Sequence, residues 1–336
     1  MKTWKNTRLD AVMLVLSIAQ LVATLLLATN WKHFSVLGWV GSFVLLVLMT
    51  VYNIIVVSHL FTHVHWFESP LLNGLVSMLN SINIGQSVQS YQFTHVRNHH
   101  RYNNDSKGPD GETKDLSSTF RGGIGYDHVS VQRYAFGGAA GTLVNVGKEL
   151  FSVTRLWRVG SQDKTLLELA SDYPAKRERE LRQIRLDRMA HFLGLSMLFY
   201  VSWKWTLLVY LPAFYLSLAL VNVQNYYEHY GAAPGSRMTD SVSYYGRIYN
   251  LLTFNDGYHQ EHHLRPQSHW TRMPEVRIKY RADLDQVERI ISPVPAILGV
   301  FHRNRKQLHR RPAAAGRPHS SNVSEANALP QVAETV

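Results

Sequence analysis

The sequence predicts an all-α integral membrane protein with four transmembrane helices, arranged as two hairpins, and a helical cap on the cytoplasmic side. Three observations predict this fold class. Long apolar runs approach the length of a bilayer, short links join these runs in pairs, and histidines gather near the run ends. The net charge of +11 suits an anionic membrane surface, so we expect no nucleic-acid partner.

Residues 11–29 and 35–57 form the first predicted hairpin. Both runs lack charged side chains, and at about 1.5 Å per residue each is near the roughly 30 Å hydrocarbon thickness of a bilayer. Only residues 30–34 separate the two runs, which predicts a tight turn. A cleaved signal peptide is the alternative for residues 1–29, but no convincing small-residue cleavage site is present, so we expect a retained span.

Residues 189–203 and 205–222 form the second predicted hairpin, with the sequence "WKW" as its tip. Tryptophan beside lysine is typical of a membrane interface. Of 35 lysines and arginines, only Lys32 and Lys204 lie at the hairpin tips, so the opposite side is predicted to be cytoplasmic. We therefore expect an integral protein of a bacterial inner membrane, with the termini and the histidine clusters on the cytoplasmic side.

One membrane domain, residues 1–304, is predicted to hold these elements. The milder apolar stretches Leu71–Val88 and Phe136–Phe151 are expected to form interfacial or re-entrant helices. The charged segment 173–188 predicts a solvated cytoplasmic helix that leads into the second hairpin. Residues 305–336 are basic and then rich in Pro, Ala, Ser and Asn, which predicts a disordered tail.

Histidines gather at four places, each near the cytoplasmic end of a predicted span. Imidazole suits iron, copper and zinc, whereas the absence of cysteine excludes disulfides, iron–sulfur clusters and thiolate sites. One ion takes about four to six ligands, so nine histidines predict two ions. Carboxylates beside the clusters (Glu228, Asp256, Glu261 and Asp105) are expected to accept hydrogen bonds from the outer ring nitrogens. The clustered side chains are His59, His63, His95, His99, His100, Asn225, His229, His259, His262 and His263.

The motifs "HLFTH", "HVRNHH" and "HQEHH" resemble, in order and spacing, the histidine boxes of the integral-membrane fatty acid desaturase and hydroxylase superfamily. "NYYEH" is similar to that family's Asn-x-x-x-His element, and "NYYEHYG" also resembles a motif of the membrane alkane hydroxylases. The resemblance implies a non-haem di-iron centre at the cytoplasmic face. It implies that the nine clustered histidines bind two iron ions and that Asn225 reaches the metal through water.

The resemblance also implies an O2-dependent enzyme that uses two external electrons to break an unactivated C–H bond in the alkyl chain of a fatty acid or lipid. A fatty acid (acyl lipid) desaturase is the first prediction. A hydroxylase of alkanes or fatty acids, and a fatty acid decarboxylase that forms terminal alkenes, begin with the same hydrogen abstraction and stay open. We expect a separate acidic electron donor, a ferredoxin or rubredoxin with its reductase, to dock on the basic cytoplasmic face.

A histidine-rich membrane metal transporter is the non-enzyme alternative, and a histidine-ligated haem protein is a second one. A transporter places ionisable groups within its spans, near the midplane of the bilayer. A haem protein needs paired histidines inside the bundle. The predicted spans are almost free of ionisable groups, and the histidine clusters lie beyond the span ends, which favours the enzyme.

Overall fold

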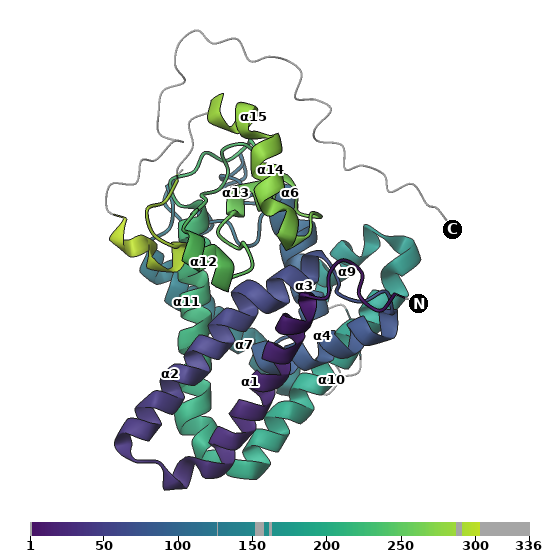
Figure 1. Ribbon diagram of the computed structural model, residues 1–336, viewed down its shortest axis with the longest axis vertical. Helices are drawn as coiled ribbons and strands as arrows, with labels where there is room; N and C mark the ends of the chain where they lie inside the picture. Colours follow the sequence, from purple (N-terminus) through teal and green to yellow (C-terminus); the bar gives the residue numbers. More distant parts are fainter. Residues whose placement is uncertain (1, 126, 152–157, 161–162, 287–290, 303–336) are drawn as a thin grey trace.

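The computed structural model describes residues 2–125, 127–151, 158–160, 163–286 and 291–302. Over these ranges the chain forms helices and no strand, apart from two isolated β-bridges, so the predicted all-α class is confirmed. The predicted tail, residues 305–336, lies outside the described residues. Long helices run through the lower part of the molecule, and short helices and loops gather at its upper end (Figure 1).

The first predicted hairpin is formed by α1 (Asp10–Asn30) and α2 (Val36–Tyr52). A short 3-10 helix, Trp31–His33, continues α1 into the turn. The hydroxyl of Ser35 then caps α2 by accepting a hydrogen bond from the Gly38 amide at 3.2 Å. This cap sets the point where the chain reverses.

The upper end of α2 does not stop at the predicted boundary. It continues through a π-helical stretch, Asn53–Ser58, into α3 (His59–His63). The first histidine pair is therefore carried on a direct extension of a long apolar helix. Such an extension fixes the height of the pair above the hairpin turn.

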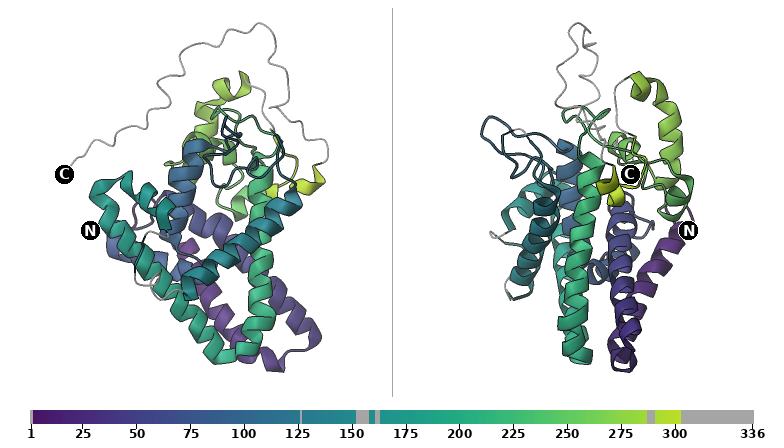
Figure 2. Two further views of the ribbon diagram at one scale, coloured as in Figure 1. Left: turned by 180° about the vertical axis from the view of Figure 1, so that it is seen from behind. Right: turned by 90° about the vertical axis from the view of Figure 1, so that its left-hand side faces the viewer.

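The second predicted hairpin is formed by α10 (Pro174–Trp205) and α11 (Leu211–His229), which a π-helical stretch, Thr206–Tyr210, joins. The backbone leaves helical geometry at Ser202, with φ −163° and ψ 88°. The two limbs meet at the lower end of the molecule (Figure 2), so the predicted tip at 203–205 lies at the turn. α10 begins well before residue 189, because the charged segment and the first limb form one continuous helix.

Three stretches of the described residues are long and apolar enough to cross a bilayer: Asp10–His33, Val36–His63 and Pro174–His229. The third stretch contains both limbs of the second hairpin. These stretches support an integral membrane protein.

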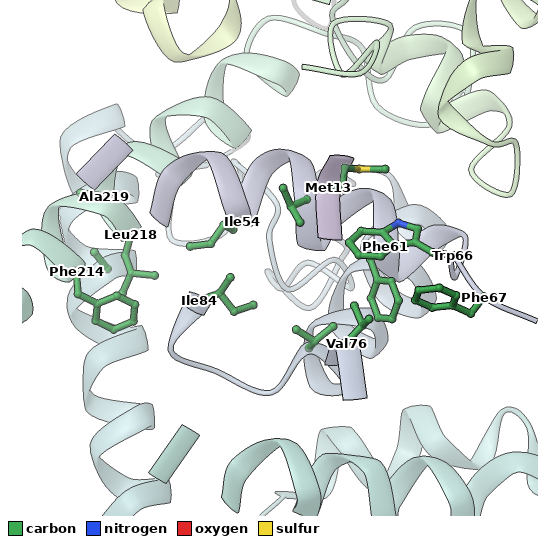
Figure 3. Close-up of a cluster of buried hydrophobic side chains, with 13 residues drawn as sticks. Met13, Ile54, Phe61, Trp66, Phe67, Val76, Ile84, Phe214, Leu218 and Ala219 are labelled. Carbon is green, nitrogen blue, oxygen red and sulfur yellow. The ribbon is translucent and has the colours of Figure 1, made fainter. Parts of the chain in front are cut away.

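Two more helices occupy the regions predicted to be interfacial. α4 (Pro70–Ile84) begins at the Ser69 cap with proline in its first turn, and it packs against α1 and α10. α7 (Gly138–Phe151) packs along α11. The hydrophobic core that joins α4 to the bundle includes Met13, Ile54, Phe61, Val76, Ile84, Phe214 and Leu218 (Figure 3).

A glycine lets α4 end against α11. Gly85 has φ 67° and ψ 24°, in the left-handed region that favours glycine. A Cβ atom at Gly85 would lie 2.3 Å from the ring of Phe214 on α11. The turn therefore requires glycine for its backbone conformation and for its close contact.

The remaining described helices are short and lie at the upper end of the molecule, opposite the hairpin turns, or against the sides of α10 and α11 (Figures 1 and 2). They bring the second and fourth histidine clusters to the upper ends of α3 and α11. They are α5 (Val88–Gln92), a π-helix (Phe93–His99), α6 (His100–Tyr102), a second π-helix (Arg133–Gly137), α9 (Lys164–Ser171), α12 (Arg247–Leu252), α13 (His259–Leu264), a 3-10 helix (Trp270–Arg272), α14 (Met273–Lys279), α15 (Arg281–Gln286) and η8 (Ala296–Phe301).

Candidate metal centre

All nine predicted histidines meet at the upper ends of α3 and α11, in two adjoining groups. The ligand atoms within each group lie within 4.8 Å of one another. His259 adjoins the second group, because its Nε2 atom lies 3.4 Å from Nε2 of His229. The first group contains His59, His63, His95, His100 and His262, and the second contains His99, His229 and His263.

A π-helix divides the second histidine cluster between the two groups. The amide of His100 donates to the carbonyl of His95, five residues earlier, which is the hydrogen bond of a π-helix. Residues five apart then share a face, and the Nε2 atoms of His95 and His100 lie 3.2 Å apart in the first group. His99 faces the second group, where its Nε2 atom lies 3.1 Å from Nε2 of His229.

The spacing of the ring nitrogens fits shared metal ions. Two nitrogens bound to one ion at about 2.1 Å are about 3.0 Å apart at a right angle and about 3.4 Å apart at a tetrahedral angle. The Nε2 atoms of His59 and His262 are 3.0 Å apart, and the other close pairs lie between 3.1 and 3.4 Å. Nε2 of His63 and of His263 is buried without a hydrogen-bond partner. Buried imidazole nitrogens with these separations form a donor set that can hold metal.

Burial also keeps most of these rings in the form that binds metal. Burial, and then the neighbouring histidines, lower the pKa of His95, His100, His262 and His263 well below the usual histidine value. A neutral imidazole offers a lone pair to an ion, whereas an imidazolium does not.

Several outward ring nitrogens meet hydrogen-bond acceptors, which fix the direction of those rings. Nδ1 of His99 lies 2.7 Å from an oxygen of Asp115. Burial lowers the pKa of His99, but the Asp115 carboxylate outweighs this effect and raises it. The other hydrogen bonds of this kind are His59 Nδ1 to the Ile55 carbonyl (3.1 Å), His229 Nδ1 to the Asp240 carbonyl (2.9 Å) and His263 Nδ1 to Asn103 (3.2 Å), while Asp256 lies 3.4 Å from His59 Nδ1 and Glu228 lies 3.6 Å from His259 Nδ1.

Two of the four expected acceptors lie beside a ring nitrogen, and the other two accept hydrogen bonds from other groups. Asp256 and Glu228 lie beside His59 and His259, respectively. Glu261 instead accepts hydrogen bonds from Ser243 and Tyr245, at 3.0 and 2.7 Å. Asp105 accepts the backbone amides of Lys114 and Asp115 at 2.9 Å, and so holds the loop that presents Asp115.

Sequence reasoning missed Asp115, Asp240 and Asn103 as partners of the histidines. Asp115 and Asn103 lie at the two ends of the polar segment "NNDSKGPDGETKD", and no motif marks them. Asn103 and Asn104 have positive φ values of 49° and 56°, so the chain turns back after α6. The Asn104 amide donates to Asp115 at 2.8 Å, which closes the loop over His99.

Asn225 lies one helical turn before His229 on α11, as its spacing predicted. Its Nδ2 atom donates to the hydroxyl of Tyr134 at 2.5 Å, and it lies 3.5 Å from the Ser117 carbonyl. The Tyr134 hydroxyl itself donates to the Ser117 carbonyl at 2.6 Å. The amide nitrogen of Asn225 is thus held by Tyr134, a residue that sequence reasoning did not identify.

A small cavity lies beside the first group. Its volume is about 10 Å³, enough for roughly one water molecule. Its polar wall includes Asn255, Asp256 and Ser268, and its apolar wall includes Leu60, Val64, Phe254, Trp270 and Met273. His59, His63 and His262 line the remaining side of this cavity. The cavity therefore has both polar and apolar walls.

Comparison with known proteins places this arrangement in a family. The sphingolipid delta(4)-desaturase of Candida albicans is 55% identical over 38 residues, which are 11% of this chain and 10% of that protein. The sphingolipid delta(4)-desaturases DES1 of Mus musculus and Drosophila melanogaster are 39% and 37% identical over 83 residues, or 24% of this chain and 24% of each relative. The matched segments thus span about a quarter or less of these relatives. No solved structure matches the chain.

These named relatives are eukaryotic, so they give no support to the expected bacterial membrane. A model of the family described as fatty acid desaturase matches residues 34–293, a range that contains every clustered histidine. Because this match covers most of the chain, the protein belongs to the fatty acid desaturase family of lipid oxidoreductases.

Proposed function

We propose that this protein is an O2-dependent desaturase that acts on the alkyl chain of a membrane lipid through two non-haem iron ions. The observation that carries the proposal is the convergence of nine histidines, eight of them buried and His95 half-buried, into two adjoining groups, in a chain of the desaturase family. Imidazole suits iron, and two ions match the two groups. Sphingolipids are the first substrates to test, because the named relatives are sphingolipid desaturases.

Each of the two histidine groups would hold one iron ion. The first group would hold one ion, and His99, His229, His259 and His263 would hold the other. When bound, the iron ions would supply the reductive activation of O2. Two hydrogens leave adjacent carbons, and O2, with two donor electrons and two protons, becomes two waters.

The surrounding side chains would orient the site and keep it dry. The outward Nδ1 hydrogen bonds hold several of the rings in place, and burial excludes bulk water from the groups. Because Tyr134 holds the amide nitrogen of Asn225, the side-chain carbonyl oxygen would be left to accept a hydrogen bond from water at the metal site.

We propose four passes through the bilayer, with the histidines on the cytoplasmic side. Each hairpin supplies two passes, and the two hairpin turns carry only Lys32 and Lys204 among the charged residues. A basic excess on the other side favours a cytoplasmic location for that side. A cytoplasmic site would also face the soluble electron donors of the cell.

We expect Asp115→Asn to weaken the hold on the second ion by about 10- to 100-fold, because it removes the charge that orients His99. The measurement is iron per chain after dialysis against a graded series of chelator concentrations. Asp110→Asn is the matched control, since Asp110 is exposed in the same loop and accepts a hydrogen bond from the Glu112 amide at 3.1 Å. Equal iron loss in the two variants would contradict the role of Asp115.

We expect a separate acidic electron donor to dock on the basic face, as the charge predicts. Arg179 and Arg182 are exposed on α10, and Arg177 pairs with Glu178 at 2.9 Å. Changing the three arginines to glutamine should raise the donor concentration for half-maximal turnover by about 3- to 10-fold. Turnover driven by a small chemical reductant is the control. A donor titration that does not change would count against docking at α10.

The test of the function is expression in a host with a simple lipid profile, followed by mass spectrometry of sphingolipids, glycerolipids and free fatty acids. The expected product is lighter than its substrate by two hydrogen atoms. A product heavier by one oxygen atom, or a volatile terminal alkene, would replace desaturation with hydroxylation or decarboxylation. Metal analysis of the purified protein should find iron. The visible spectrum of the same preparation should show no haem absorption.

A further inference from the structure

The short helix α12 exposes an apolar face. Ile248, Leu251 and Leu252 are 77%, 79% and 62% exposed, and their spacing of three and four residues places them on one side of the helix. The opposite side faces inward, where Asn250 is buried and donates to the Tyr244 carbonyl at 2.9 Å. Clustered exposed apolar side chains on so short a helix indicate an apolar partner.

The position of α12 along α2 identifies that partner as the bilayer. The hydroxyl of Tyr52, at the end of α2, donates to the Leu252 carbonyl at 2.5 Å. Tyr52 lies about 24 Å from Val36 along α2, at about 1.5 Å per residue, so it falls within the roughly 30 Å of hydrocarbon that α2 can cross. α12 therefore lies beside the end of α2, at a depth that the hydrocarbon of the bilayer can reach.

A second segment, η8, also exposes apolar side chains. Leu298, Val300 and Phe301 are 45%, 55% and 70% exposed. η8 packs against α11, where a Cβ atom at Gly299 would lie 2.2 Å from Tyr227. Figures 1 and 2 show η8, in yellow, close beside α11. Two apolar segments thus flank the upper ends of long apolar helices.

The inner side of α12 contacts Asp256, which lies beside a histidine of the first group. The hydroxyl of Tyr249 donates to Asp256 at 3.1 Å, and the other oxygen of Asp256 lies 3.4 Å from Nδ1 of His59. Phe254 and Asn255, which follow α12, have positive φ values of 52° and 64° and line the small cavity beside the first group. A movement of α12 would therefore open the wall of that cavity.

We propose that α12 is a lateral gate through which the alkyl chain of a lipid in the bilayer reaches the first histidine group. The inference rests on the proposed function and adds the route of entry: the lipid comes from within the bilayer, whereas an acyl thioester would arrive dissolved in water. The cavity, with room for about one water, is too small for an alkyl chain, so the gate is closed in this conformation. Opening would break the hydrogen bond between Tyr52 and Leu252.

The first arm of the test measures where α12 lies and needs no catalysis. The chain has no cysteine, so single-cysteine variants carry one spin label each. Leu251→Cys is compared with Leu45→Cys on α2, as the lipid reference, and with Ile278→Cys on α14, as the reference on the cap. In vesicles, the label at 251 should collide with O2 dissolved in lipid as the label at 45 does. Collisions dominated by a water-soluble nickel complex would overturn the proposal.

The second arm measures the ratio of turnover of one long-chain lipid in vesicles to its turnover in detergent micelles. Leu251→Ser should lower this ratio by about tenfold. Burying one leucine side chain in lipid stabilises its position by more than about 1.4 kcal/mol, the free energy of a tenfold change. Ile278→Ser, which is 75% exposed on the cap, should keep the parent ratio. An unchanged ratio in Leu251→Ser would overturn the gate. If the parent enzyme desaturated no lipid, the proposed function would fail while the first arm still located α12.

Discussion

His262→Ala is expected to reduce desaturated product to background. Nε2 of His262 lies 3.0 Å from Nε2 of His59, and the side chain is buried within the first group. Alanine removes one imidazole from five and leaves a buried space without a donor. Loss of a residue that only orients a ligand costs about 10- to 100-fold in metal affinity or activity, and loss of a ligand should cost more. Product is measured by mass spectrometry of lipids, and metal content by elemental analysis.

His65→Ala is the matched control for this prediction. His65 lies close to the first cluster in sequence, but its ring packs on Phe61, with centroids 4.9 Å apart, and it belongs to neither group. Burial lowers the pKa of His65 to about 4, so this variant removes a neutral ring. We expect product and metal content near those of the parent. If His262→Ala desaturated lipid at the rate of the control, the assignment of the first group as a metal site would be wrong.

Gly85→Ala is expected to destabilise the helix bundle by roughly 2–5 kcal/mol. The left-handed backbone at Gly85 costs about 1–2 kcal/mol for a residue with a side chain. The new Cβ atom would meet the ring of Phe214 at 2.3 Å, and overpacking of this kind costs about 1–3 kcal/mol. The measurement is the free energy of unfolding of the purified protein in detergent.

Gly111→Ala separates these two contributions. Gly111 also has a positive φ of 78°, but a Cβ atom there would have no neighbour within 4 Å. Its cost should be the backbone part alone, about 1–2 kcal/mol. Phe214→Leu in the Gly85→Ala background should recover part of the loss. Equal destabilisation by the two glycine variants would show that the contact with Phe214 carries no energy.

Some features of the fold and the site could be predicted because they are local in the sequence. The runs 11–29 and 35–57 are recognisable by their length and lack of charge, and α1 and α2 follow them. The nine histidines stand in short motifs near the ends of such runs, and the structure brings all nine together.

Other features depend on contacts between distant segments, which spacing cannot reveal. Asp240 and Asn103 become partners of His229 and His263 only after the loops fold over the site. The hydrogen bond between Tyr52 and Leu252, which sets the place of α12, joins residues 200 positions apart. The charged segment 173–188, by contrast, was predicted as a helix that leads into the second hairpin, and α10 joins it to the first limb.

The π-helix at Phe93–His99 has a consequence for protein design. In a regular α-helix, His95 and His99 would lie about 40° apart, and His95 and His100 about 140° apart. The π-helix turns residues five apart toward the same face, so the Nε2 atoms of His95 and His100 lie 3.2 Å apart. A designer who copied the letters "HVRNHH" onto an ideal helical scaffold would therefore transplant the motif and lose the close approach of these two rings. The graft has to carry the irregular backbone along with the side chains.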